Sequence, residues 1–280
     1  MTPTLVRHQS PAASAPPAQA CARARDWAEI QERMLVPLYE AVYERLEVGP
    51  ATRLLGLGCG SGLALLMAAS HGARVTGVDT RPERLALARE RLLPEGVWGR
   101  VGERDGARVL EGGPQAAGPA GARYNLVTSF EPVGCAAGDA DGLVPALEAG
   151  VGLAERGAVV VLAGWGPPER CATSGVLRVA TRLTDAPRWR PSRRDDLEDL
   201  ASRAGLRPDG SGRVACPFGY ADQDSAVRGL LSTGLFDAAA RATDQVQVEK
   251  ELAEALHPHL RRDGTVWMPN VFRYLIARTP

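Results

Sequence analysis

Short apolar runs alternate with segments of helical spacing through the first two thirds of the chain. Runs of five or six mostly apolar residues, as expected for strands buried on both faces, lie at 53–57, 74–78, 97–101, 124–129 and 158–163. Helices are predicted between them, at about 62–70, 80–92 and 143–154. This alternation predicts an α/β fold with a doubly wound, mostly parallel sheet.

Both ends of the chain depart from this alternation. Residues 1–24 are rich in Pro, Ala and Ser and predict a disordered tail that can be removed without loss. Beyond Gly164, helices are expected at about 192–204, 226–231 and 235–256, followed by a strand at 270–277. We therefore expect one domain over residues 25–280, made of N-terminal cap helices (25–50), a ligand-binding core (51–164) and C-terminal elements (165–280).

Three alternate glycines follow the first predicted strand and precede a helix. Gly58, Gly60 and Gly62 let the backbone approach a ligand closely, and the helix that follows presents free N–H groups to it. Asp79 ends the second predicted strand, where its carboxylate would face a ribose diol. Together these residues predict a nucleoside-containing cofactor.

The glycine spacing identifies the kind of nucleoside site. A dinucleotide fingerprint needs Gly or Ala at position 63, which is Leu63 here, whereas the G-x-G-x-G spacing resembles class I S-adenosylmethionine-dependent methyltransferases. The segment 124–130 is similar to that family's fourth-strand motif. The resemblance implies a Rossmann-like fold with S-adenosylmethionine as cofactor and an antiparallel last strand, which 270–277 fits. It also implies helical lid elements over a small-molecule substrate, such as a secondary metabolite.

The same resemblance nominates the site residues. Those implied to bind the cofactor are Gly58, Cys59, Gly60, Gly62, Asp79, Thr80, Glu103, Arg104 and Ser129. Glu103 takes the place of the acid after the third strand that reads the adenine amino group, with Asp105 as the alternative. Phe130 and Glu131 would face the transferable methyl group and the substrate. A covering N-terminal helix would put Trp27 or Tyr39 in the cleft wall, although core packing explains either residue as well.

No catalytic base stands out in the sequence. Methyl transfer from an activated sulfonium can be accelerated by positioning alone, so the reaction does not require one. Glu131 is the best-placed carboxylate, and a solvated loop acid explains it equally well. His257 and His259 could act near neutral pH, but a helix end also accounts for them.

One position departs from the family pattern. Gly56 stands where family members usually carry an acid that helps hold the ammonium group of the cofactor. Either water and strand-end carbonyls near Ser129 replace that acid, or the cofactor binds weakly or serves another role. The second possibility suggests an alternative function, a cofactor-retaining cyclase or isomerase on the same scaffold. A non-catalytic partner subunit is a third hypothesis.

Composition narrows the partners. With 33 basic and 33 acidic residues, the chain has no net charge to attract nucleic acid or an anionic membrane. The basic cluster at 188–194 is followed at once by acids, which favours a solvated helix face. Five cysteines without a C-x-x-C spacing indicate neither a disulfide framework nor a metal site, and predict a cytoplasmic protein. No apolar run is long enough to span a membrane.

Overall fold

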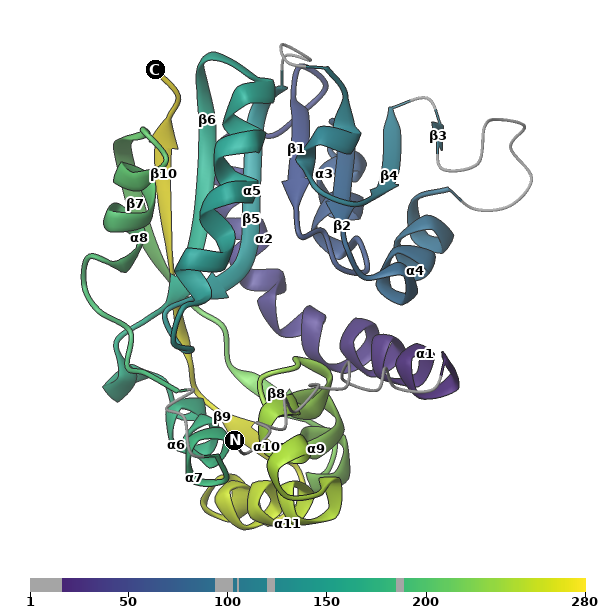
Figure 1. The fold of residues 1–280 in the computed structure, drawn as a ribbon, viewed down its shortest axis with the longest axis vertical. Helices are drawn as coiled ribbons and strands as arrows, with labels where there is room; N and C mark the ends of the chain where they lie inside the picture. The colour runs from purple at the N-terminus through teal and green to yellow at the C-terminus, as the bar shows by residue number, and fades with distance from the viewer. Residues whose placement is uncertain (1–16, 94–102, 105, 120–123, 185–188) are drawn as a thin grey trace, which may run out of the picture.

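One mixed sheet organises the molecule (Figure 1). The computed structural model describes residues 17–93, 103–104, 106–119, 124–184 and 189–280. Within these residues, eight strands pair in the order β3-β4-β2-β1-β5-β6-β10-β7. Their bounds are β1 Arg53–Leu57, β2 Arg74–Asp79, β3 Glu103–Arg104, β4 Ala107–Glu111, β5 Tyr124–Val133, β6 Ala154–Trp165, β7 Arg207–Ala215 and β10 Val271–Arg278.

The predicted fold class is confirmed. Strands β4, β2, β1, β5 and β6 are parallel, and β10 lies antiparallel between β6 and β7. The last strand therefore has the place and direction expected for residues 270–277. All five parallel strands end at the edge of the sheet that Figure 1 shows at the bottom, where a ligand is expected in an open α/β sheet.

Helices cover both faces of the sheet because the central strands are apolar on both faces. Leu54 and Leu65 belong to the core on the side of α2 (Val36–Arg45), α3 (Leu63–Ser70) and α4 (Pro82–Leu92). Leu55, Leu147 and Leu197 belong to the core on the opposite side, formed with α5 (Asp139–Leu153) and α8 (Asp196–Arg203). The two cores fix the strand ends that carry the glycines and Asp79.

A cluster of short elements lies below the carboxyl edge of the sheet in Figure 1. It consists of α6 (Thr173–Leu177), α7 (Val179–Arg182), β8 (Phe218–Tyr220), α9 (Gln223–Ser232), α10 (Asp237–Ala242), α11 (Gln245–Leu256) and β9 (Val266–Met268). The single helix predicted for 235–256 is broken before Gln245, where the Asp244 carboxylate accepts the N–H of Gln247 and begins α11. In the described part of the chain, no helix combines the length and apolarity of a membrane span.

The N-terminal segment starts earlier than predicted. Residues 17–24, expected to belong to a disordered tail, instead form most of helix α1 (Pro17–Asp26); residues 1–16 lie outside the described residues. A π-helical turn (Trp27–Gln31) and a 3-10 turn (Glu32–Leu35) connect α1 to α2. Helix α1 packs against α4 and α9, with Ala24 buried and Arg23 paired with Asp237.

We therefore expect residues 17–24 to be needed for full stability. A chain that begins at Arg25 loses the buried Ala24 side chain and the Arg23–Asp237 ion pair, which together cost about 1–3 kcal/mol of unfolding free energy. Thermal denaturation against a chain that begins at Ala15, which keeps the whole of α1, measures the loss. Equal melting temperatures would contradict the prediction.

The third parallel strand also differs from the prediction. Val97–Val101 lies outside the described residues, and the strand beside β2 is β4. Glu103 and Arg104 form β3, which pairs antiparallel with Arg108 and Ala107 at the amino end of β4. The prediction that Glu103 follows the third strand at the carboxyl edge, beside the cofactor, is therefore wrong.

Candidate functional site

The turn after β1 has the open geometry that its glycines predict. Gly58 and Gly60 have φ angles of 60° and 57°, in the region that side-chain-bearing residues rarely adopt. The Cys59 N–H donates to the Val78 carbonyl at 3.0 Å, which ties the turn to β2. A Cβ atom on Gly58 would have only Glu131 Oε2 near it, at 3.7 Å. The backbone at Gly58 is therefore open to a ligand.

Gly62 serves packing rather than the open turn. It has a φ angle of 80° at the start of α3, and a Cβ there would lie 3.0 Å from the Cβ of Ala88 in α4. Gly62 lines none of the cavities described below. The third glycine thus lets α3 approach α4, a packing role that the sequence analysis did not predict.

Asp79 connects the ends of β1 and β2. Its side chain is almost fully buried, and its Oδ2 accepts the Gly60 N–H at 2.9 Å while Oδ1 accepts the Arg81 N–H at 2.9 Å. Each carboxylate oxygen can accept more than one hydrogen bond. Asp79 therefore fixes the glycine turn and retains lone pairs for hydroxyl groups of a ligand.

An ion pair crosses the carboxyl edge in front of Asp79. Arg81 Nη2 lies 3.2 Å from Glu131 Oε2, and Arg81 Nε lies 3.6 Å from Asp79 Oδ1. The Arg81 and Glu131 side chains are both well exposed, so solvent weakens their attraction. Glu131 lines both the first and the second of the cavities described below.

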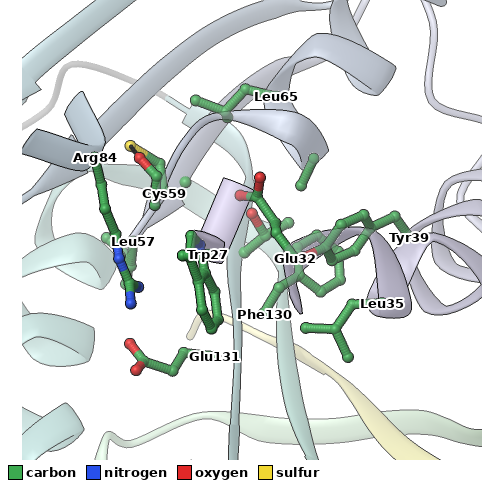
Figure 2. A pocket seen from close by; sticks show the side chains of 15 residues that line it. Trp27, Glu32, Leu35, Tyr39, Leu57, Cys59, Leu65, Arg84, Phe130 and Glu131 are labelled. Atoms are coloured by element: carbon green, nitrogen blue, oxygen red, sulfur yellow. Dashed lines mark hydrogen bonds between the residues drawn. The ribbon is translucent and has the colours of Figure 1, made fainter. Parts of the chain in front are cut away.

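A narrow cavity lies beneath the N-terminal segment (Figure 2). Trp27, Glu32 and Tyr39 line it together with the glycine turn and Phe130. The Phe130 ring packs against Tyr39 with ring centroids 4.8 Å apart. Trp27 and Tyr39 therefore do line the cleft, and Phe130 forms part of its buried wall.

Glu32 is a functional candidate that the sequence analysis missed. It is only 3% exposed, and its Oε2 accepts hydrogen bonds from the Ser61 hydroxyl and from Arg91 Nη1, the latter at 2.7 Å. Within the described residues, neither a hydrogen bond nor an ion pair reaches the other oxygen, Oε1. Oε1 lies 3.2 Å from the position that a Cβ on Gly60 would occupy.

Arg84 also lines this cavity, next to Trp27. Its guanidinium carbon lies 3.9 Å from the centre of the Trp27 ring, and Nη2 donates to the Ser232 carbonyl at 2.8 Å. Burial lowers the pKa of Arg84 to about 10, so the side chain stays positively charged at neutral pH. Arg84 thus links α4, the N-terminal segment and α9 around one positive charge.

Two larger cavities continue from this one. A cavity of about 400 Å³ is lined by Asp79, Thr80 and Ser129, and it shares Gly58 and Glu131 with the narrow cavity. A third cavity, of about 260 Å³, shares Cys135, Ala136 and Leu235 with the second. The three cavities therefore adjoin one another, in a series from the N-terminal segment to α10.

Most residues that line the third cavity are apolar, and its two charged lining residues are Asp237 and Arg241. Leu177 and Ala180 are buried in α6 and α7, and Trp189, Leu235 and Ala238 complete the apolar walls. The backbone at its entrance is fixed by Asp139, whose Oδ2 accepts the N–H groups of Gly134, Cys135 and Ala136.

Arg190 joins the hydrogen-bond network around Asp139. Its Nη1 lies 2.9 Å from Asp196 and its Nη2 lies 3.4 Å from Asp139. The basic cluster at 188–194 was predicted to be a solvated helix face. Arg190, in its described part, is instead half-buried and holds two carboxylates in place.

The space beside Gly56 is filled by a leucine. A Cβ on Gly56 would lie 2.9 Å from Leu65 Cδ2, and one on its pairing partner Gly77 would lie 2.4 Å from Leu65 Cδ1. Leu65 is held between the two glycines and is almost fully buried. Gly56 is therefore the packing site of Leu65 and not an open position that lacks an acid.

Other candidate residues lie away from the cavities. His257 and His259 form the turn after α11 and line none of the three cavities, as the helix-end interpretation expects. Among the residues that the structure describes, no group of His, Cys, Asp and Glu side chains could hold a metal ion. The site is thus built from backbone, carboxylates and arginines.

Comparisons with known proteins agree with this geometry. Residues 54–140 match a family model described as a methyltransferase domain. The comparison with curated proteins gives no match. A candidate methyltransferase from Bacillus halodurans is 13% identical with a TM-score of 0.55, over 86% of this chain and 98% of its own. A candidate sarcosine dimethylglycine methyltransferase from Galdieria sulphuraria is 13% identical with a TM-score of 0.52, over 87% and 86%.

A cyclase has a similar fold. The cyclase SpnF is 15% identical with a TM-score of 0.50, over 87% of this chain and 80% of its own. At these identities the likeness concerns the fold alone, and function has to be argued from the residues of the site.

Proposed function

We propose that this chain is a class I S-adenosylmethionine-dependent methyltransferase that transfers a methyl group to a small-molecule acceptor, a proposal supported by the match of residues 54–140 to a methyltransferase domain and by the fold. The family supports methyl transfer in general. The small acceptor is our proposal, and it rests on the size and lining of the three adjoining cavities.

The residues of the first two cavities fit S-adenosylmethionine. Gly58 leaves its side of the turn open, Asp79 has lone pairs for a ribose diol, and Thr80 and Ser129 line the space beside it. A buried indole N–H on Trp27 and Glu32 Oε1 both lack partners within the described residues. When bound, the cofactor supplies a methyl group on a positively charged sulfur.

The third cavity carries the proposal for the acceptor. At about 260 Å³ it lies just below the usual range of ligand pockets, and its walls are mostly apolar. It adjoins the second cavity, with which it shares Cys135, Ala136 and Leu235 as lining residues. An acceptor that fits there is small and largely apolar.

The chain's own groups would act mainly by positioning. Asp139 holds the loop between the second and third cavities, and Glu131 stands where the first two meet. Binding holds the two reactants in line, so the translational and rotational entropy that the reaction would otherwise lose has already been lost. This effect can account for much of the acceleration. Exclusion of water by the apolar walls favours the same outcome.

The test fills the third cavity without touching the first two. Ala238 lines the third cavity, and we expect Ala238→Phe to lower kcat/KM for a small apolar acceptor, identified by screening for S-adenosylhomocysteine release, by about tenfold or more. The affinity for S-adenosylhomocysteine should stay unchanged. Ala242→Phe, at an exposed position of the same helix, is the matched control.

Two results would contradict this proposal. If Ala238→Phe turns over the acceptor as fast as the unmodified chain, the acceptor does not bind in the third cavity. If the chain converts a small molecule without releasing S-adenosylhomocysteine, it is not a methyltransferase, and the cofactor-retaining cyclase or isomerase becomes the better hypothesis.

A further inference from the structure

Two polar groups without hydrogen-bond partners among the described residues, one acceptor and one donor, lie close to Gly60. Glu32 Oε1 and Trp27 Nε1 each lie 3.2 Å from the position that a Gly60 Cβ would occupy. Glu32 comes from the 3-10 turn and Trp27 from the π-helical turn of the N-terminal segment. Both line the narrow cavity shown in Figure 2.

We propose that Glu32 and Trp27 together bind an α-amino acid group, Glu32 Oε1 accepting from its ammonium and Trp27 Nε1 donating to its carboxylate. This inference rests on the proposed function, because the α-amino acid group is then the methionine end of S-adenosylmethionine. The N-terminal segment therefore supplies the carboxylate that β1 does not carry at Gly56.

The burial of Glu32 is the first argument. A carboxylate that is 3% exposed loses most of its hydration, and such a group is stable only when it is paired and hydrogen-bonded. Arg91 and the Ser61 hydroxyl satisfy Oε2 alone. A cationic N–H donor on Oε1 completes the carboxylate, and a charge-assisted hydrogen bond of this kind is stronger than a neutral one.

The indole of Trp27 is the second and independent argument. Its N–H is buried and has no hydrogen-bond partner within the described residues, although buried donors are nearly always paired. The guanidinium of Arg84 lies over the same ring, 3.9 Å from its centre. A carboxylate placed at the indole N–H thus gains a donor and a nearby positive charge.

The two arguments meet in one ligand group. The unpaired acceptor, Glu32 Oε1, would bind a cationic donor, and the unpaired donor, Trp27 Nε1, would bind an anion. Both atoms lie beside Gly60. A single α-carbon that carries an ammonium and a carboxylate satisfies both. The cavity is narrow, so only the small amino-acid end of a ligand fits between Trp27 and Gly60.

The experiment compares two ligands that differ only in this group. S-adenosylhomocysteine carries the amino acid, whereas 5′-methylthioadenosine keeps the nucleoside and sulfur but lacks it, and both are measured by calorimetry on the full chain. Glu32→Gln can keep an acceptor toward Ser61 and Arg91 while it turns a donor toward the ligand. We expect it to weaken S-adenosylhomocysteine about tenfold to a hundredfold and 5′-methylthioadenosine less than about threefold.

Glu29→Gln is the matched control. Glu29 is an exposed acid three residues earlier in the same segment, so its removal changes net charge equally without touching the cavity. We expect it to leave both affinities unchanged. Trp27→Phe removes the indole N–H and keeps an aromatic ring over Arg84, and it too should weaken S-adenosylhomocysteine more than 5′-methylthioadenosine. It carries the test if Glu32→Gln fails to fold.

Each remaining outcome overturns a different statement. Equal weakening of the two ligands by a folded Glu32→Gln variant would make Glu32 a support of the glycine turn only. Binding of 5′-methylthioadenosine but not of S-adenosylhomocysteine by the unmodified chain would also overturn the inference, with the nucleoside site intact. Binding of neither ligand would overturn the proposed function itself.

Discussion

Replacing Asp79 is expected to cause the largest loss of cofactor affinity. Asp79→Ala removes the acceptor for the ribose hydroxyls and also frees the Gly60 N–H, which its Oδ2 now accepts at 2.9 Å. The first loss alone amounts to about 1.5–3 kcal/mol, or roughly tenfold to a hundredfold in affinity. Because the glycine turn loosens as well, we expect the effect to lie at the upper end, measured by calorimetry with S-adenosylmethionine.

Two further variants separate these contributions. Asp79→Asn keeps one carbonyl acceptor for Gly60 or a hydroxyl and should lose less affinity than Asp79→Ala. Glu111 pairs with Asp79 across β2 and β4 but is exposed and lines none of the three cavities, so Glu111→Ala should bind normally. An unchanged affinity in a folded Asp79→Ala variant would remove Asp79 from the cofactor site.

The sequence predicted the part of the site that depends on local rules. A glycine turn after a buried strand and an acid at the end of the next strand meet wherever parallel strands end at one edge, and the structure places Gly58 and Asp79 there. The third glycine could not be separated from the first two, because its role depends on how closely Ala88 in α4 approaches Gly62. That contact is tertiary and leaves no mark on the spacing.

Glu32 could not be found from helical periodicity. A regular helix starting near Asp26 places the apolar residues inward and leaves position 32 on no particular face. The π-helical turn at Trp27–Gln31 widens the helix and changes the direction of the residues that follow, so that Glu32 is buried. Glu32 stands between Gln31 and Arg33 and three residues after Glu29, so its place in the sequence does not single it out as a buried acid.

Restoring an acid at Gly56 is expected to destabilise the protein rather than to improve binding. A Cβ at this position would lie 2.9 Å from Leu65 Cδ2, so Leu65, whose Cδ1 occupies the space beside Gly77, would have to shift. Overpacking of this kind costs about 1–3 kcal/mol, and burial of an unpaired carboxylate adds to it. We expect Gly56→Asp to lower the melting temperature by about 5–15 °C and to leave the affinity for S-adenosylhomocysteine unimproved.

A variant of Leu65 tests whether the contact with this side chain causes the loss of stability in Gly56→Asp. Leu65→Ala removes the methyl groups that block the Cβ, so the double variant Gly56→Asp/Leu65→Ala should lose less stability than the two single changes add up to. Gly152→Asp, at an exposed position with no atom within 4 Å of its Cβ, should change the melting temperature little. Tighter binding of S-adenosylhomocysteine by a stable Gly56→Asp variant would show that the ammonium site lies at β1, and Glu32 would then lose the role that its free oxygen indicates.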